Sequence, residues 1–383
     1  MSRLVLQNGS IYTPGGVIEN GYLIVRENGE IEAIGAGQAP SAGDAEVRDC
    51  TGLLVLPGFI DVHVHGGGGV GMLEATFEGL EGMSRYHAQF GTTAFLATSS
   101  TTDMDRIKRA LRNAAESIGK TTGAELAGIH LEGPYLNEIR RGAQSKDHIR
   151  LPQIDEIQEL LNEAGGHIRL VTLAPEVEGG LKASAWLAEQ GVTVSAGHSN
   201  ATFAEMEAAV QHGVNHTTHH FNGMSPFHHR DPGLAGAGMI LPELTTELIC
   251  DGIHVHPGAV KLLFEVKKPE GVCMITDAIF AAGLPNGDYK NIVVKDGVIM
   301  LSDGSSLAGS SLTMLQALKN VIRFTGLSLE TVLPSLTAVP ARQVRLDQTK
   351  GSLEPGKHAD FLLLTPELEL QATFVRGKEV YSA

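Results

Sequence analysis

Two patterns of hydrophobic and polar positions divide the chain. Within the first fifty residues, short alternating runs at Leu4–Gln7, Tyr22–Arg26 and Ile31–Ile34 are separated by NG, GG and ENGE turns and predict β-strands. From Leu53 onward, short apolar runs of strand type alternate with segments of helical periodicity. Beyond Arg342 the β-like pattern returns in GSLEPGKHADFLLL and LQATFVRGKEV. We therefore expect both chain ends to form one small β domain beside a larger α/β domain.

The middle of the chain consists of repeated strand–helix units. Strand-like runs such as Thr92–Thr98 and Glu125–Leu131 each precede a segment of helical periodicity. Helices are expected at Asp103–Ile118, Pro152–Ala164, Gly179–Gln190, Phe203–His212, Pro257–Val266, Ser311–Phe324 and Ser328–Ala338. Repeated units of this kind imply a parallel sheet, and at this length a closed barrel. We predict an α/β fold in which a (β/α)8 TIM-like barrel spans 55–342 and a small β-sandwich domain combines 1–54 with 343–383.

Composition and charge narrow the class of protein. A chain of 383 residues has room for a barrel of about 250 residues and a smaller domain. The formal charge of −15 disfavours binding to nucleic acid or to an anionic membrane surface. The N-terminus lacks an apolar signal core, and no apolar run reaches the roughly 18 residues of a membrane span. Three widely spaced cysteines, Cys50, Cys250 and Cys273, indicate reduced thiols, so we expect a cytoplasmic enzyme.

Five strand-like segments end on residue types that bind metal ions. These residues are His63 and His65, Glu132, His198, His219 and Asp277. A single buried histidine is more often a core residue than a ligand, but here the residues recur where a parallel barrel gathers its catalytic side chains. Alternation along a strand places His63 and His65 on one face. Nitrogen and carboxylate donors suit zinc, iron(II) or manganese, so the pattern predicts a metal-dependent hydrolase.

A glycine-rich segment suggests a competing function. Gly66, Gly68 and Gly71 match the GxGxxG fingerprint of dinucleotide-binding folds, and they follow a strand. The match is weak because the four-glycine run Gly66–Gly69 fits many patterns, and no conspicuous acidic residue ends a second strand about 20 residues further on. We interpret the run as flexible backbone beside His65, and a nicotinamide enzyme is disfavoured.

Several longer motifs carry a resemblance to a known family. The segments PGFIDVHVHG, HLEGPYL, AGHSNA, THHFNGMSPFHHRDPG, DGIHV and ITDA occur in this order along the chain. With them, the chain resembles the N-acetylglucosamine-6-phosphate deacetylases of the amidohydrolase superfamily over essentially its whole length. The resemblance implies a barrel, a homodimer, and hydrolysis of N-acetyl-D-glucosamine 6-phosphate to D-glucosamine 6-phosphate and acetate. Such a reaction belongs to amino-sugar catabolism or recycling.

The resemblance also implies a role for each candidate ligand. The shared metal site would consist of Glu132, His198 and His219. His63 and His65 match those family members that hold a second metal, so one or two divalent ions (Zn, Fe or Mn) are expected. Asp277 would be the catalytic acid/base. His216 and His220 are expected to be structural or surface residues.

Substrate-binding positions follow from the same resemblance. They are Ala143, Gln144, Asn222, Gly223, Arg230, His254, Leu307, Ala308 and Gly309. Arg230 and His254 would grip the phosphate, and the resemblance leaves open whether Arg230 acts within its own subunit or across the dimer. Gln144 is a departure, because some relatives carry a carbonyl-polarising histidine there. The amide of Gln144 can donate a hydrogen bond but carries no positive charge. The metal would therefore contribute more of the polarisation of the substrate carbonyl.

Three other functions remain open at the level of sequence. An N-acetylgalactosamine-6-phosphate deacetylase would use the same site. A cyclic amidase is weaker, because hydantoinases bridge two metals with a modified lysine, whereas this chain offers Glu132 at the strand end. A non-catalytic scaffold on the same fold is disfavoured because every ligand type and Asp277 are present.

Overall fold

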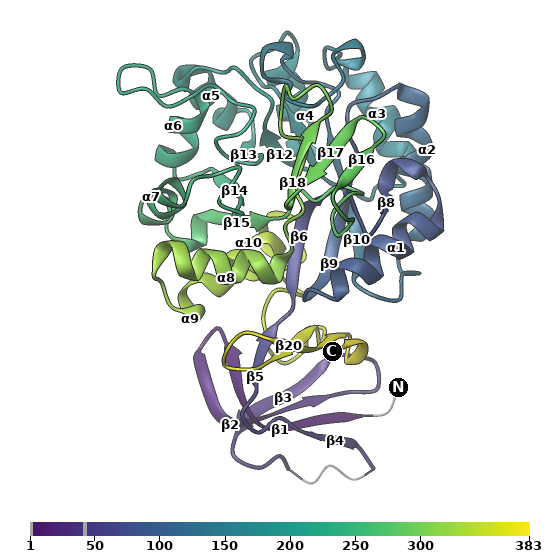
Figure 1. Ribbon diagram of the computed structural model, residues 1–383, viewed down its shortest axis with the longest axis vertical. Helices are drawn as coiled ribbons and strands as arrows, with labels where there is room; N and C mark the ends of the chain where they lie inside the picture. Colours follow the sequence, from purple (N-terminus) through teal and green to yellow (C-terminus); the bar gives the residue numbers. More distant parts are fainter. Residues whose placement is uncertain (1–2, 41–43) are drawn as a thin grey trace.

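The computed structural model describes residues 3–40 and 44–383. A barrel surrounded by helices occupies one end of the long axis, and a small β domain occupies the other (Figure 1). The C-terminus and the first described residues lie in the small domain (Figure 1). None of the helices in the described part of the chain has the length and apolar character that a bilayer crossing requires.

The barrel is a parallel sheet of eight strands among the described residues, in the order β15-β14-β13-β12-β11-β10-β9-β6. The strands are β6 (Phe59–Val64), β9 (Thr92–Thr98), β10 (Glu125–Glu132), β11 (Ile168–Leu173), β12 (Thr193–Ala196), β13 (Val214–Thr217), β14 (Thr245–Ile249) and β15 (Val272–Ile275). The amide of Asp277, just past β15, donates to the carbonyl of His63 on β6 at 2.9 Å and joins the two ends of the sheet. The predicted α/β barrel is confirmed.

Helices pack around the barrel (Figure 1). They are α1 (Phe77–Ala88), α2 (Met104–Ser117), α3 (Ile154–Glu163), α4 (Gly180–Glu189), α5 (Phe203–Gln211), α6 (Gly233–Ile240), α7 (Pro257–Lys267), α8 (Met314–Thr325), α9 (Leu329–Val332) and α10 (Ala338–Gln343). Helix α2 illustrates why these segments are helical. Asp103 caps its first turn by accepting from the amide of Arg106 at 2.9 Å, and buried Ile107, Ala110 and Leu111 recur at helical spacing.

One helical prediction needs correction, and two helices, α1 and α6, were not predicted. The single helix expected at Ser328–Ala338 is interrupted by a 3-10 turn at Leu333–Leu336, and α10 starts only at Ala338. Pro334 lies in that turn and has no amide hydrogen for a continuous helix. Helix α6 was not predicted, because its sequence GLAGAGMI is buried at nearly every position and has no polar face to give a helical period.

The small domain is built from both ends of the chain. Its sheet has the order β21-β20-β19-β5-β1-β2-β3, with β4 paired to β1. The strands are β1 (Leu4–Thr13), β2 (Gly16–Val25), β3 (Ile31–Ala36), β4 (Glu46–Asp49), β5 (Leu54–Pro57), β19 (Phe361–Leu364), β20 (Leu370–Val375) and β21 (Lys378–Ser382). One continuous hydrogen-bonded sheet therefore encloses a separate core, in which Leu6 and Leu23 meet Phe361 and Phe374.

A third sheet lies beside the barrel mouth and was not predicted. It is an antiparallel sheet of β16 (Gly287–Tyr289), β17 (Ile292–Lys295) and β18 (Val298–Leu301), inserted between β15 and α8. These strands are short and separated by turns, so their sequence resembles a loop. In Figure 1 the insert lies in front of the barrel strands.

The first two glycines of the run after His65 are buried and packed closely, which the expectation of flexible backbone did not anticipate, whereas Gly68 and Gly69 are exposed. Gly66–Gly67 forms a two-residue strand, β7, that pairs with β8 (Val70–Gly71). A Cβ atom on Gly66 would lie 2.4 Å from the carbonyl oxygen of Val70 and 2.6 Å from the amide of Phe280. The glycines therefore allow two loops to approach each other beside the site.

Candidate metal centre and active site

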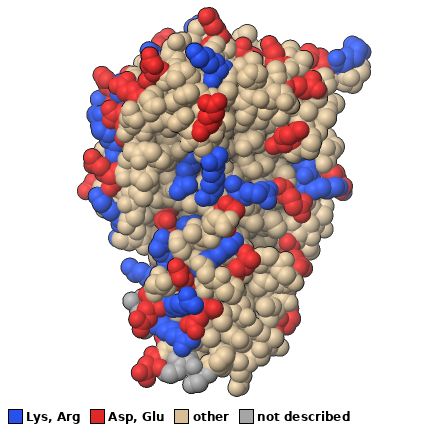
Figure 2. Space-filling model, turned by 180° about the vertical axis from the view of Figure 1, so that it is seen from behind, with Lys and Arg blue, Asp and Glu red and all other residues tan. Residues whose placement is uncertain are grey.

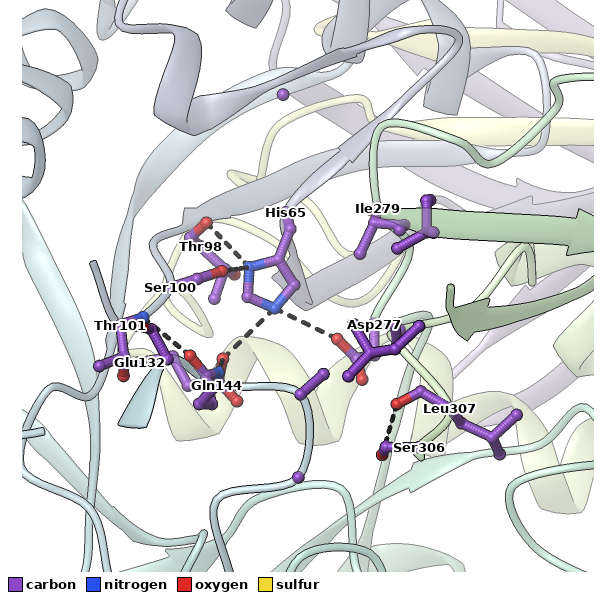
Figure 3. A pocket seen from close by; sticks show the side chains of 18 of the residues that line it. His65, Thr98, Ser100, Thr101, Glu132, Gln144, Asp277, Ile279, Ser306 and Leu307 are labelled. Atoms are coloured by element: carbon purple, nitrogen blue, oxygen red, sulfur yellow. Dashed lines mark hydrogen bonds and ion pairs between the residues drawn. The ribbon is translucent and has the colours of Figure 1, made fainter. Parts of the chain in front are cut away.

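A cavity of about 580 Å³ opens at the C-terminal ends of the barrel strands. Its lining includes His65, Glu132, His198, His219 and Asp277. Figure 3 shows His65 pointing between Glu132 and Asp277, with Gln144 beside Glu132. This is the end of the barrel at which (β/α)8 enzymes carry their active sites.

Strand ends position every one of these side chains. His63 lies within β6 and is fully buried, whereas His65 follows the strand and reaches the cavity. Glu132 is the last residue of β10. His198, His219 and Asp277 each lie two residues beyond a strand, on left-handed backbone with φ of 46°, 31° and 51°.

The six side chains form two groups of three metal-ligand atoms, each within 4.8 Å. One group is Glu132, His198 and His219, and the other is His63, His65 and Asp277. In the first, Glu132 Oε1 lies 3.2 Å from His198 Nε2 and 3.3 Å from His219 Nε2. In the second, Asp277 Oδ1 lies 3.2 Å from His65 Nε2 and 3.5 Å from His63 Nε2.

Glu132 lies between the two groups. Its Oε1 is 3.5 Å from His63 Nε2, and its Oε2 is 3.4 Å from His65 Nε2. One carboxylate therefore faces imidazoles of both groups, as a ligand shared between two ions would.

The charge balance of the site fits a bound cation. Burial lowers the pKa of His63, but Glu247, Asp277 and Glu132 outweigh burial and raise that pKa to about 10. Burial likewise raises the pKa of Asp277, but the nearby His63 and His65 hold it below its ordinary value. Buried carboxylates thus concentrate negative charge at this point, and a divalent ion would neutralise it. Imidazole nitrogen and carboxylate oxygen are donors that zinc, iron(II) and manganese accept.

Gln144 is held in place by two hydrogen bonds. Its Nε2 donates to Glu132 Oε2 at 2.5 Å, and its Oε1 accepts from the amide of Thr101 at 2.8 Å. The side chain therefore lies at the cavity wall against a candidate ligand. Its amide group still has a second N–H for another acceptor.

Most predicted substrate positions line the same cavity. They are Ala143, Gln144, Asn222, Gly223, His254, Leu307, Ala308 and Gly309. His254 Nδ1 lies 2.6 Å from Asp251 Oδ2, which fixes the ring at the mouth. Arg230 is the exception. It lies outside the cavity lining of its own chain, is exposed, and contacts the ring of His229 at 2.7 Å.

Several residues of the site were not anticipated from the sequence. Lys290 and Asn291 border the cavity from the inserted sheet, and Arg106 borders it from the start of α2. Glu247 is fully buried on β14 beside His63 and was missed because it lies inside the strand TTELI, where no motif marks it. His216 and His220 are both buried and outside the cavity lining, in keeping with a structural role for each.

Comparison with known proteins agrees with this geometry. The sequence profile of the Amidohydrolase family matches residues 54–380. N-acetylglucosamine-6-phosphate deacetylase from Bacillus subtilis is 37% identical over 382 residues, which covers 98% of this chain and 96% of that protein. N-acetylgalactosamine-6-phosphate deacetylase from Escherichia coli O157:H7 is 36% identical over 330 residues, covering 85% of this chain and 87% of that one. A mutant N-acetyl-D-glucosamine-6-phosphate deacetylase from Mycobacterium smegmatis, solved with N-acetyl-D-glucosamine-6-phosphate, superposes with a TM-score of 0.93 at 31% identity and full coverage of both chains. This chain belongs to the amidohydrolase family.

Proposed function

We propose that this protein hydrolyses N-acetyl-D-glucosamine 6-phosphate to D-glucosamine 6-phosphate and acetate. The observation that carries the proposal is the convergence of two three-donor groups on one cavity at the C-terminal end of the barrel, with Asp277 in the second group. Relatives of 36–40% identity that bear the name of this deacetylase support the choice of substrate.

We propose that Glu132, His198 and His219 hold one divalent ion, and that His63 and His65 hold a second beside it. The donor set suits Zn, Fe or Mn. A bound ion would polarise the amide carbonyl and acidify water at the site. Gln144 would orient Glu132 and offer its remaining N–H to the carbonyl oxygen of the substrate.

Asp277 would carry the proton through the reaction. Its carboxylate faces the cavity, and its lowered pKa keeps it ionised and able to accept a proton from the attacking water. It would then return the proton to the nitrogen of the departing amine, which is otherwise a poor leaving group. Transfer of this kind is worth roughly 10²–10⁴-fold in rate.

The sugar phosphate would lie across the cavity, away from the reacting amide. His254 and the loop of Asn222 and Gly223 line one side, and Leu307–Gly309 lines another. We propose that Arg230 contacts the phosphate group of a substrate bound in a neighbouring subunit. The reason is that Arg230 lies outside the cavity lining of its own subunit. A charged hydrogen bond from arginine to phosphate would add to the positive charge that Arg106 and Lys290 already bring to the cavity.

Exposed apolar side chains in one stretch of the chain support a homodimer. They are Phe227, Ile240, Ile253, Leu262 and Val266. They lie on α6, on α7 or in the loops that precede these helices, and Arg230 lies in the loop before α6. Large exposed apolar side chains that gather on one face are typical of protein–protein contacts. We also place the protein in the cytoplasm, because its three cysteines are unpaired and buried.

A substrate panel tests the function. Metal-loaded protein would be assayed for acetate release from N-acetylglucosamine and N-acetylgalactosamine, each with and without a 6-phosphate. We expect a clear preference for N-acetylglucosamine 6-phosphate. A preference for the galactosamine epimer would instead support the second candidate, which the Escherichia coli O157:H7 relative favours. Turnover of a cyclic amide alone, or of no substrate, would refute the deacetylase.

A further inference from the structure

The four imidazoles of the site are oriented in the same way. Each directs Nε2 toward the candidate ligand cluster and has an oxygen atom close to Nδ1. For His65, His198 and His219 a main-chain carbonyl lies there, at 3.2 Å, 3.0 Å and 3.1 Å, and His65 Nδ1 also has the uncharged hydroxyl of Ser100 at 3.1 Å. For His63 it is the side-chain carboxylate of Glu247, at 2.9 Å. His63 therefore differs from the other three in having a charged acceptor.

Glu247 is placed to hold both groups of ligands. The residue lies in the middle of β14 and is fully buried. Its Oε2 accepts from the ring of His63 and also from the main-chain amide of His219 at 2.9 Å. Its Oε1 lies 3.2 Å from His216 Nε2. One carboxylate thus contacts the side chain of one candidate ligand and the backbone of another.

We propose that Glu247 is a positioning residue that fixes His63 with its proton on Nδ1 and its lone pair on Nε2, directed at the ion. The inference rests on the proposed metal site. A neutral imidazole carries one proton, and the acceptor at one nitrogen decides which nitrogen is free to coordinate. A carboxylate accepts more strongly than a carbonyl and makes the imidazole a more basic ligand, which compensates for the deep burial of His63.

Glu247 serves this role better than that of a ligand. His63, His130 and Glu247 also bring three ligand atoms within 4.8 Å, which formally suggests another ion site. Both oxygens of Glu247, however, are already engaged by nitrogen atoms of His63, His216 and His219. The hydrogen-bonded arrangement therefore satisfies the carboxylate without an ion.

Three variants separate positioning from general structural support. Glu247→Leu removes the acceptor at similar volume, and we expect the ion at His63 and His65 to bind about 10–100-fold more weakly. Glu247→Gln keeps an oxygen that accepts from Nδ1, so it should retain most of that affinity. His216→Phe is the matched control, because it removes another hydrogen bond from the same carboxylate and leaves the one to His63. It should keep the metal content of the parent.

Elemental analysis and competition with a chelator would measure these affinities, independently of turnover. Parent affinity in Glu247→Leu, or an equal loss in Glu247→Leu and His216→Phe, would overturn the proposal. If Glu247→Leu does not fold, the parent protein still provides a test by NMR. The parent would be labelled with 15N-histidine and loaded with zinc, and the His63 signals would be assigned by their absence in His63→Gln. The proposal requires that the proton of His63 lies on Nδ1. Protonation at Nε2 would refute it. The acetate-release assay on the four sugars does not depend on these metal measurements. A failure of the deacetylase proposal would therefore be distinguished from a failure of the Glu247 proposal.

Discussion

A buried lysine between the barrel and the small domain provides a test of how the two parts are joined. Lys350 has only 2% of its side chain exposed. Its Nζ donates to Asp360 Oδ2 at 2.6 Å and to Glu125 Oε2 at 2.7 Å. Glu125 starts barrel strand β10, and Asp360 immediately precedes β19 of the small domain. Replacement of Lys350 by Met would leave two largely buried carboxylates, with the half-exposed Arg376 at 3.5 Å from Glu125 as the remaining nearby cation.

The structure allows the loss of stability to be estimated. Breaking a buried ion pair by removing one partner costs about 3–5 kcal/mol, because an uncompensated charge stays inside. At about 2.1 cal/mol/K per residue, a chain of 383 residues has an unfolding entropy of roughly 0.8 kcal/mol/K. Lys350→Met should therefore lower Tm by about 4–6 °C in differential scanning calorimetry.

A partly exposed lysine serves as the matched control. Lys319 pairs with Glu369 at 2.7 Å, but the two side chains are 30% and 65% exposed, so Lys319→Met should cost less than about 1 kcal/mol. Neutralising both partners, in Lys350→Met with Glu125→Gln and Asp360→Asn, should recover most of the loss. If Lys350→Met costs no more than Lys319→Met, the buried cluster does not stabilise the junction.

The pH dependence gives a second check on the same cluster. Burial raises the pKa of Glu125, but Lys350 outweighs it and holds the pKa below the ordinary value. A carboxyl group with a depressed pKa stabilises the fold above its unfolded pKa of about 4.3, and this contribution is lost as the pH falls through the folded pKa. The stability difference between the parent and Lys350→Met should therefore shrink below about pH 4.

Three further predictions concern the site. Replacing His63 and His65 together by Gln should lower the metal content by about one ion, and an unchanged count in elemental analysis would contradict a second site. Asp277→Asn should keep metal and slow kcat by roughly 10²–10⁴-fold, whereas near-parent turnover would exclude it as proton carrier. Arg230→Ala should lower kcat/KM for the phosphorylated sugar roughly 10–150-fold and spare the free sugar. Mixing Arg230→Ala with Asp277→Asn subunits should restore activity if Arg230 acts across the dimer.

The sequence predicts the barrel well because its elements are locally encoded. Helix α2 carries its own cap at Asp103 and its own apolar stripe, so its limits differ from the prediction by one residue at each end. Helix α6 carries no such signal, since seven of its eight residues are buried and none of the eight is polar. The inserted sheet β16–β18 has short strands and many turns, and its role at the cavity appears only in three dimensions.

The candidate ligands could be recognised because their positions are also encoded locally. His198, His219 and Asp277 each lie just after a strand-like run, and such a position can be identified from the sequence alone. Glu247 was not recognisable, because its contact with His63 depends on closure of the barrel between β15 and β6. Arg230 illustrates a different limit, because its side chain contacts the adjacent His229 in its own chain, and a role in a neighbouring subunit cannot be read from one chain.

The left-handed backbone at His198, His219 and Asp277 implies a conflict between the stability of the fold and the proposed activity. A non-glycine residue in this conformation costs on the order of 1–3 kcal/mol and persists only where its surroundings enforce it. Glycine or asparagine would relieve that cost and at the same time remove the side chain of a candidate ligand or of the proposed proton carrier. At these three positions a stabilising substitution and an inactivating one would be the same change. Selection for heat resistance alone would therefore erode the site, so a programme to engineer this protein must screen for turnover at every round.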